Sequence, residues 1–344
     1  MSAVRIEGDA LHVGAMRITF HRTLRLPDDG RVHPLPPSLG PFPLFRVDDY
    51  AGRVPDAWRG HGGVFLPMWQ REAMWLSFAP ERPWEPQAVK VACGMVNAVS
   101  GAPWRQELDH GDAQDYLVCP PQPWIDGFKT ADGQVRQFVA MPLGMGYTAE
   151  GQLTGEETVG GVQLVVVPPR AGRFRPPPPR VHAETARLAS AKDGMPAPAP
   201  QAMAAGAPPG GMEMGLGAGG RMRQQLYPDP HGPETWDAAR AARVFVHIAN
   251  SQLFREITGL APPETPVSAQ TYAQHGLPWY DLYDEHLGDV GAAGPLAGLR
   301  SVKEMDAAHG FGPQQDVDPV EVPPGVVRRM PVRPPRDGVR DGDW

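Results

Sequence analysis

Residues 16–26 read Met-Arg-Ile-Thr-Phe-His-Arg-Thr-Leu-Arg-Leu, and apolar and polar side chains alternate along most of this stretch. A period of two is typical of a β-strand with one face on a core and the other toward solvent. The expected core face, with Arg22 as its exception, is Met16, Ile18, Phe20, Leu24 and Leu26. The expected solvent face is Arg17, Thr19, His21, Thr23 and Arg25. Pro27 to Gly30 then supply turn residues, so the segment predicts a strand that ends in a turn.

The rest of the N-terminal half repeats this kind of pattern in short pieces. Further strands are predicted at 63–69, 73–78, 88–98, 115–119, 134–141 and 161–167. The chain also contains 42 Pro and 40 Gly, and so many helix breakers exclude an all-helical bundle. Short strands with Pro and Gly turns predict a mainly β fold, an antiparallel β-sandwich or partly open barrel with a short helical C-terminal part.

Composition divides the chain into four parts. Residues 1–170 are predicted to form the antiparallel β domain, and 171–222 are rich in Pro, Gly, Ala and Met. Such a segment buries little apolar surface to offset its ordering entropy, so we expect a linker or mobile loop. Residues 223–311 contain a strand pattern at 244–249 and short helices, and they either form a small separate region or complete the N-terminal sheet. Residues 312–344 are predicted to be a Pro-rich tail.

Charge and cysteine content bear on partners and compartment. The formal net charge is −7 and no Lys/Arg-rich block stands out, so nucleic acid is not the expected partner. No window of 18 apolar residues occurs, so no membrane insertion is expected. The first residues lack a secretory signal pattern, and Cys93 and Cys119 are too few for a disulfide framework. We therefore expect a cytoplasmic protein with reduced thiols.

Three Pro-Trp pairs recur at intervals of twenty residues, at Trp84, Trp104 and Trp124. One strand is predicted between each pair and the next, so Trp84 and Trp124 are expected at one end of the sheet and Trp104 at the other. Two rings stiffened by the preceding proline are candidates for stacking a ligand or anchoring a partner. The alternative is that these rings plug the end of the sheet.

An acidic cluster follows Pro278, which is predicted to start a helix over 279–286. Asp281, Asp284, Glu285 and His286 lie in this segment, and oxygen and imidazole ligands on one helix face could hold a divalent ion. The alternative is a solvated acidic helix face, because no distant ligand pair with zinc spacing is visible.

Arg17, His21 and Arg25 form a basic stripe on the predicted solvent face of the first strand. It could bind an anion, although solvated surface is the commoner meaning of such a stripe. Cys93 and Cys119 lie in apolar strand patterns, where a thiol is a small inert side chain.

Neither a phosphate-binding loop nor a nucleophile elbow occurs in the sequence. We therefore expect a non-catalytic binding or assembly protein with a protein partner and no cofactor, and no sequence feature indicates its oligomeric state. One alternative is a metal-assisted hydrolase that uses the acidic helix. Another is a β-sandwich that binds a small molecule or a glycan.

Overall fold

The computed structural model describes residues 4–109, 114–177, 213–264, 278–282, 285–292, 294–311 and 322–329. The strands of the first half are β1 (Val4–Glu7), β2 (Ala10–Val13), β3 (Met16–Thr23), β4 (Val32–His33), β5 (Ser38–Pro41), β6 (Phe45–Arg46), β7 (Val64–Pro67), β8 (Ala73–Pro80), β9 (Gln87–Cys93), β10 (Val96–Asn97), β11 (Leu117–Cys119), β12 (Trp124–Ile125), β13 (Gly127–Ala131), β14 (Gln134–Pro142) and β15 (Val162–Val167). The later strands are β16 (Glu213–Arg223), β17 (Ala242–Ala249), β18 (Trp279–Asp281) and β19 (Val327–Arg329). The α-helices are α1 (Asp56–His61), α2 (Ala149–Thr154), α3 (Ser251–Thr258), α5 (Gly294–Ala297) and α6 (Val302–Ala308). The 3-10 turns are η1 (Asp48–Tyr50), η3 (Pro233–Thr235), η4 (Ala238–Arg240), η5 (Glu285–Leu287) and η6 (Pro324–Val326).

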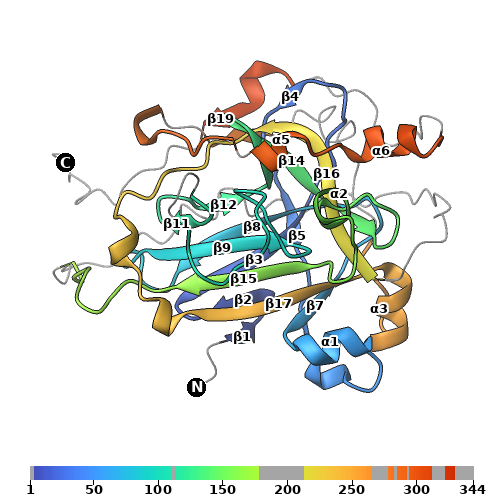
Figure 1. The fold of residues 1–344 in the computed structure, drawn as a ribbon, viewed down its shortest axis with the longest axis horizontal. Helices are drawn as coiled ribbons and strands as arrows, with labels where there is room; N and C mark the ends of the chain where they lie inside the picture. The colour runs from blue at the N-terminus through green and yellow to red at the C-terminus, as the bar shows by residue number, and fades with distance from the viewer. Residues whose placement is uncertain are drawn as a thin grey trace, which may run out of the picture.

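The strands form two layers of a mainly antiparallel sheet that does not close, which confirms the predicted fold class. In one layer β3 pairs with β2 and β8, and in the other β15 pairs with β9 and β17 (Figure 1). Apolar side chains from both layers meet in the main core between them. Its members include Ile18, Phe20, Leu76, Val91, Leu164 and Val246.

Strand β3 shows how far the alternation in the sequence decides burial. Met16, Ile18 and Phe20 lie in the main core as predicted. Leu24 and Leu26 are also buried, but they lie in a second cluster on the outer side of this layer. The difference arises because β3 ends at Thr23, so the chain beyond it no longer follows the alternation of the strand.

The expected solvent face of β3 is mostly covered, which corrects the prediction for its central residues. Arg17 is exposed, whereas Thr19, His21 and Thr23 are buried. Strand β5 pairs with β3 here, and Thr23 Oγ1 donates to Pro37 O at 2.7 Å. Contacts with neighbouring strands and with Pro37 therefore bury a face that alternation alone assigns to water.

Strands β14 and β16 connect the two layers. They pair over almost their whole length, β14 also pairs with β8 of one layer, and β16 pairs with β17 of the other. β17 in turn lies between β15 and β7. Strands from both sides of the Pro/Gly-rich segment thus share one sheet.

Residues 213–222 were expected in the linker, and the structure places them in β16 instead. The glycines here permit close packing. A Cβ on Gly217 would lie 2.7 Å from Tyr147 O, and one on Gly220 would lie 2.5 Å from Pro27 O. Glycine content therefore marks a crowded strand here, where composition alone predicts flexibility.

Much of the predicted linker and tail, namely 178–212, 312–321 and 330–344, lies outside the described residues. The described part of the tail, 322–329, contains η6 and β19, and β19 pairs with β18. No described helix is long and apolar enough to span a membrane.

α3 spans Ser251–Thr258 and ends at Gly259, and Asn250 caps it with its Oδ1 2.7 Å from Leu253 N. The predicted helix over 279–286 is wrong at its start, because Trp279–Asp281 is strand β18. Tyr280 exchanges backbone hydrogen bonds of 2.6 and 2.9 Å with Leu35, and this bridge holds the segment extended.

Buried glutamines bond the backbone where regular pairing stops. Gln137 Oε1 accepts from Leu26 N at 2.9 Å, and its Nε2 donates to Leu24 O at 2.7 Å. Gln163 Oε1 accepts from Met95 N at 2.9 Å, and its Nε2 donates to Gly160 O at 2.8 Å. Each amide side chain replaces a missing peptide partner.

We predict that Gly217→Ala lowers the free energy of unfolding by about 1–3 kcal/mol, because the added methyl group must displace the backbone at Tyr147. Gly60→Ala in α1 is the control, since nothing lies within 4 Å of its Cβ position. Replacing a glycine by alanine in a helix raises the free energy of unfolding by about 0.4–1 kcal/mol. The urea unfolding midpoints of the two variants measure these changes. Equal midpoints for Gly217→Ala and Gly60→Ala would contradict the packing explanation.

Candidate functional site

The three Pro-Trp tryptophans lie at the ends expected from the strand crossings. Trp84 is in the turn between β8 and β9, and Trp124 pairs with Ser77 near the end of β8. Trp104 N donates to Met95 O at 2.9 Å, beyond the other end of β9. Trp84 is half-buried, whereas Trp124 is 6% exposed. Of the two candidate contact residues, Trp84 therefore has the larger exposed ring area.

Trp124 belongs to a second apolar cluster on the outer face of the β3–β8 layer, here called the outer aromatic cluster. It consists of Leu24, Leu26, Leu35, Trp75, Trp124, Val135, Met222, Tyr227, Trp279, Tyr280 and Leu282. The Trp75 and Trp124 rings meet edge to face with centroids 6.2 Å apart. This burial agrees with the interpretation that Trp124 plugs the end of the sheet. The ring has almost no exposed surface with which to bind a ligand.

A histidine with two hydroxyl partners lies beside this cluster. His21 Nδ1 is 2.9 Å from Ser38 Oγ, and its Nε2 is 2.8 Å from Ser77 Oγ. The imidazole stacks on the Trp75 indole with centroids 3.9 Å apart and an interplanar angle of 8°. We call His21, Ser38, Trp75 and Ser77 the His21 site.

Strand register brings the His21 site together. His21 lies opposite Trp75 in the β3–β8 pair, and Thr19 lies opposite Ser77. Ser77 is therefore the diagonal neighbour of His21 on the same face. Ser38 reaches the ring from β5, which pairs with the other edge of β3.

Burial differs within the His21 site. His21 is 4% exposed and Trp75 is 2% exposed, whereas Ser38 and Ser77 are half-buried. Because the stacked indole and two hydroxyls hold the ring, the imidazole is positioned to exchange a proton with either serine. The sequence predicts His21 in a basic stripe on the solvent face of the strand. No local motif signals the site, since Ser77 is distant in the chain.

Of the acidic residues predicted as metal ligands on one helix face, Asp281 lies on a strand. Asp281 is on β18 and pairs with Arg223 at 3.6 Å. His286 is exposed in η5, while Asp284 and the side chain of Glu285 lie outside the described residues. No group of three His, Cys, Asp or Glu side chains suited to a metal occurs among the residues described.

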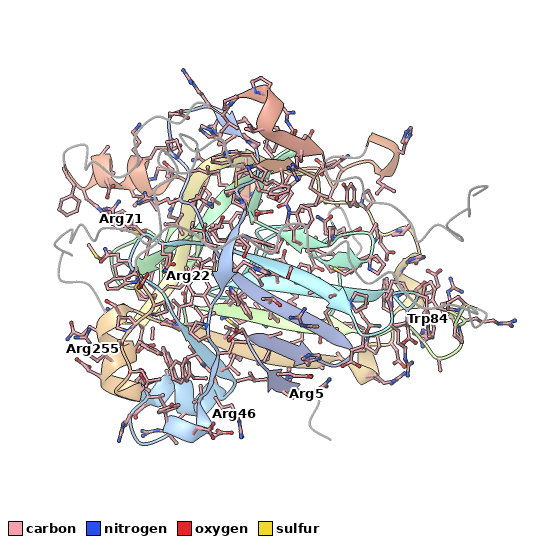
Figure 2. All side chains as sticks on the ribbon, turned by 180° about the vertical axis from the view of Figure 1, so that it is seen from behind. Arg5, Arg22, Arg46, Arg71, Trp84 and Arg255 are labelled. Carbon is pink, nitrogen blue, oxygen red and sulfur yellow. The ribbon has the colours of Figure 1, made fainter. Side chains whose placement is uncertain are left out.

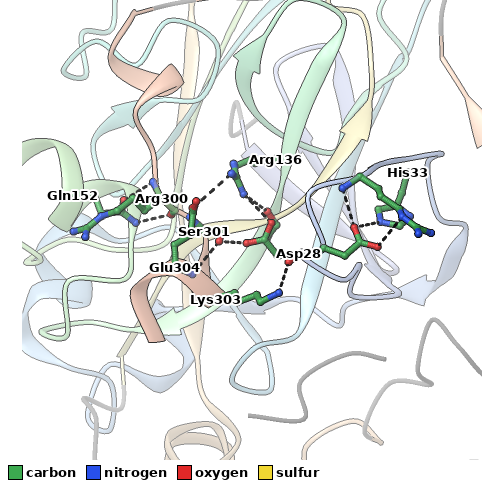
Figure 3. Close-up of polar contacts among 11 residues, drawn as sticks. Asp28, His33, Arg136, Gln152, Arg300, Ser301, Lys303 and Glu304 are labelled. Atoms are coloured by element: carbon green, nitrogen blue, oxygen red, sulfur yellow. Dashed lines mark hydrogen bonds and ion pairs between the residues drawn. The ribbon is translucent and has the colours of Figure 1, made fainter. Parts of the chain in front are cut away.

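Other charged groups fasten the C-terminal segment to the sheet (Figure 3). Arg136 on β14 donates to Asp28 at 3.3 Å and lies 3.6 Å from Glu304 of α6. Ser301 Oγ donates to the other oxygen of Asp28 and accepts from Glu304 N at 3.1 Å. Lys303 donates to Asp28 O at 2.8 Å. This serine is wholly used as a helix cap and anchor, so we assign it a structural role.

A second contact holds the same helix. Arg71 donates to both oxygens of Asp306 at 2.7 and 2.9 Å, and Tyr147 Oη donates to Asp306 at 2.7 Å. Burial raises the pKa of Asp306, but the bonds from Arg71 and Tyr147 outweigh this effect and hold that pKa below its usual value.

Lys129 makes a comparable contact, because it pairs with Asp289 of the C-terminal segment. Burial lowers the pKa of Lys129, and the carboxylate only partly opposes this.

Both cysteines, Cys93 and Cys119, are free and lie in the main core. Burial raises the pKa of each thiol, so neither is suited to act as a nucleophile.

Comparisons of this chain with protein-family models, curated proteins and solved structures found no match. Function is therefore inferred from the geometry of the described residues alone.

We predict that Asp306→Asn lowers the free energy of unfolding at pH 7 by about 1–3 kcal/mol, because it weakens two charge-assisted bonds to Arg71. The folded pKa of Asp306 lies below its usual value, so this stabilisation is complete above about pH 4 and is lost as pH falls through the folded pKa. Denaturant titrations at several pH values should show the difference from wild type shrinking in acid.

Asp56→Asn is the control for this experiment, since Asp56 pairs with Arg59 while its side chain is 92% exposed. A surface pair contributes about 0–1 kcal/mol. A loss for Asp306→Asn no larger than that for Asp56→Asn would contradict the anchoring role.

We predict that native protein resists alkylation by iodoacetamide, because Cys93 and Cys119 are buried with raised pKa values. In denaturant without reductant, the intact mass should increase by two adducts. Fast modification of the folded protein, or fewer than two adducts after unfolding, would contradict the buried free thiols.

Proposed function

We propose that this chain is a binding or assembly protein, and that Trp84 contacts a protein partner. The observation that supports this most is the half-buried Trp84 ring in the β8–β9 turn, with the Arg82 guanidinium 5.8 Å from its centroid. Trp and Arg are the residue types most enriched at the energetic centres of protein interfaces.

The turn that presents Trp84 is internally bonded. Glu85 N donates to Arg82 O at 2.9 Å, and Arg82 Nη1 donates to Glu85 Oε2 at 3.1 Å. Glu81 N donates to Ala15 O at 2.8 Å, which fastens the turn to the neighbouring strand pair. A turn ordered before binding loses little entropy on binding, which favours a contact role.

The location of Trp84 also suits a separate contact surface. Figure 2 shows it at the opposite extreme of the molecule from Arg71 and Arg255. Arg71, which anchors α6 through Asp306, is therefore distant from it. Both free cysteines are compatible with a partner in the cytoplasm, where we propose that the protein acts.

The two alternative functions have less support. A hydrolase built on Asp281 needs a helix face that β18 does not provide. A glycan platform of Trp84 and Trp124 needs two exposed rings, and Trp124 is buried. A single half-buried ring beside a cation fits a protein contact better than a stacked sugar.

Trp84→Ala tests the proposal against Trp104→Ala, a matched control. Trp104 also follows a proline, is half-buried and has a cation, Lys90 Nζ, 5.7 Å from its ring centroid, but its backbone lies at the other end of the strands. We predict that Trp84→Ala weakens capture of native partners at least tenfold while Trp104→Ala retains it. Melting temperatures confirm that both variants fold.

A photo-crosslinking residue at position 84 should then join to a protein partner that is identified by mass spectrometry. Equal partner capture by the two alanine variants and wild type would contradict a role for Trp84. Binding of a purified glycan that Trp84→Ala abolishes, without any protein crosslink, would favour the glycan alternative.

A further inference from the structure

We propose that Ser77 is a nucleophile for acyl transfer and that His21 is its general base. The inference is independent of the proposed partner contact at Trp84. It rests on the Ser77 Oγ to His21 Nε2 distance of 2.8 Å and on the groups that fix the imidazole in that position.

The arrangement has the three parts that an activated serine requires. Ser77 supplies the hydroxyl, His21 Nε2 is within hydrogen-bond reach of it, and Ser38 Oγ lies 2.9 Å from His21 Nδ1. Gly40 N donates to Ser38 Oγ at 3.1 Å, which orients that hydroxyl. With the proton on Nδ1 and directed at Ser38, Nε2 is the nitrogen that accepts the proton of Ser77.

Trp75 orients the imidazole and stabilises its charged form, as a carboxylate does in other serine sites. Its indole lies parallel to the imidazole with centroids 3.9 Å apart, so it holds the ring in one orientation. The face of an indole also attracts a cation. The indole therefore stabilises the imidazolium that forms when His21 takes a proton. Trp75 and Ser38 are positioning residues, and Ser77 and His21 are the catalytic residues.

Access to the hydroxyl defines the substrate class. Ser77 is half-buried on the outer face of β8, while His21 behind it is 4% exposed. Trp124 lies opposite Ser77 in the β8–β12 pair, and Trp75 precedes it by two residues on the same face. Because both rings are buried, only the hydroxyl is accessible, and this access suits a small ester with a good leaving group, such as an aryl ester.

The reaction uses only the ester and water. Ser77 Oγ attacks the ester carbonyl, the new O–C bond forms, and the hydroxyl proton moves to His21 Nε2. The bond to the leaving phenoxide breaks, and that oxygen takes the proton from Nε2. Water then attacks the acyl-serine with His21 again as base, which releases the carboxylic acid and restores the Ser77 hydroxyl.

A fluorophosphonate probe tests the first step, because its reaction forms a stable Ser77 Oγ–P bond and releases fluoride. We expect the folded full-length chain to gain one probe mass on the peptide that contains Ser77. Ser77→Ala should lose the label, and His21→Gln should slow labelling by about 10²–10⁴-fold. Ser251→Ala, at the start of α3, is the control and should label at the wild-type rate.

The pH dependence separates activation from mere exposure. Labelling of wild type should rise with pH as His21 loses its proton and then reach a plateau, and Ser38→Ala should move the midpoint of that rise. Ser38→Ala leaves His21 in place, so it decides the question if His21→Gln fails to fold. No label at Ser77 in wild type, unchanged labelling in folded His21→Gln, or an unchanged midpoint in Ser38→Ala overturns the proposal.

Discussion

The irregular parts of this fold depend on hydrogen bonds between buried glutamine side chains and the backbone. A chain with 42 Pro and 40 Gly has short strands, and every buried peptide group beyond a strand end still needs a partner. Gln137 continues the bonding of the β3 chain past its end, and Gln163 closes the turn after β9. Gln122 accepts from Tyr227 N at 3.0 Å and donates to Trp124 O at 3.0 Å, which links two loops. Because one amide both donates and accepts, it replaces a strand neighbour at each of these places.

The same constraint explains how much of the fold the sequence reveals. Alternation along β3 and the apolar runs of β15 and β17 predict which residues are buried, since a period of two follows directly from strand geometry. Alternation does not state what covers a face, so His21 was expected in water and is buried, stacked on Trp75 and bonded to Ser38 and Ser77. The glycines of β16 were expected to be flexible for a similar reason, because composition does not show which backbone they touch. Short-range patterns thus specify strands, whereas the pairing of strands specifies the layers.

The candidate sites show the same limit. Trp84 was identified from the sequence because a Pro-Trp pair in a turn is a local signal. The His21 site has no local signal, since its members come from β3, β5 and β8 and meet only through register. The acidic segment after Pro278 had a helical spacing, yet the backbone bridge between Leu35 and Tyr280 makes its start a strand. One strand connects the two proposals, because β8 contains Ser77 and leads directly into the turn that presents Trp84.

The pairing of β14 with β16 has a consequence for the synthesis of the chain on the ribosome. β14 ends at Pro142, and its partner begins only at Glu213. At about 5–20 residues per second, the interval is roughly 4–14 s. β15 likewise waits for β17, so nascent chains expose two unpaired apolar strand edges during translation. Both edges gain their partners only after β16 and β17 have been synthesised.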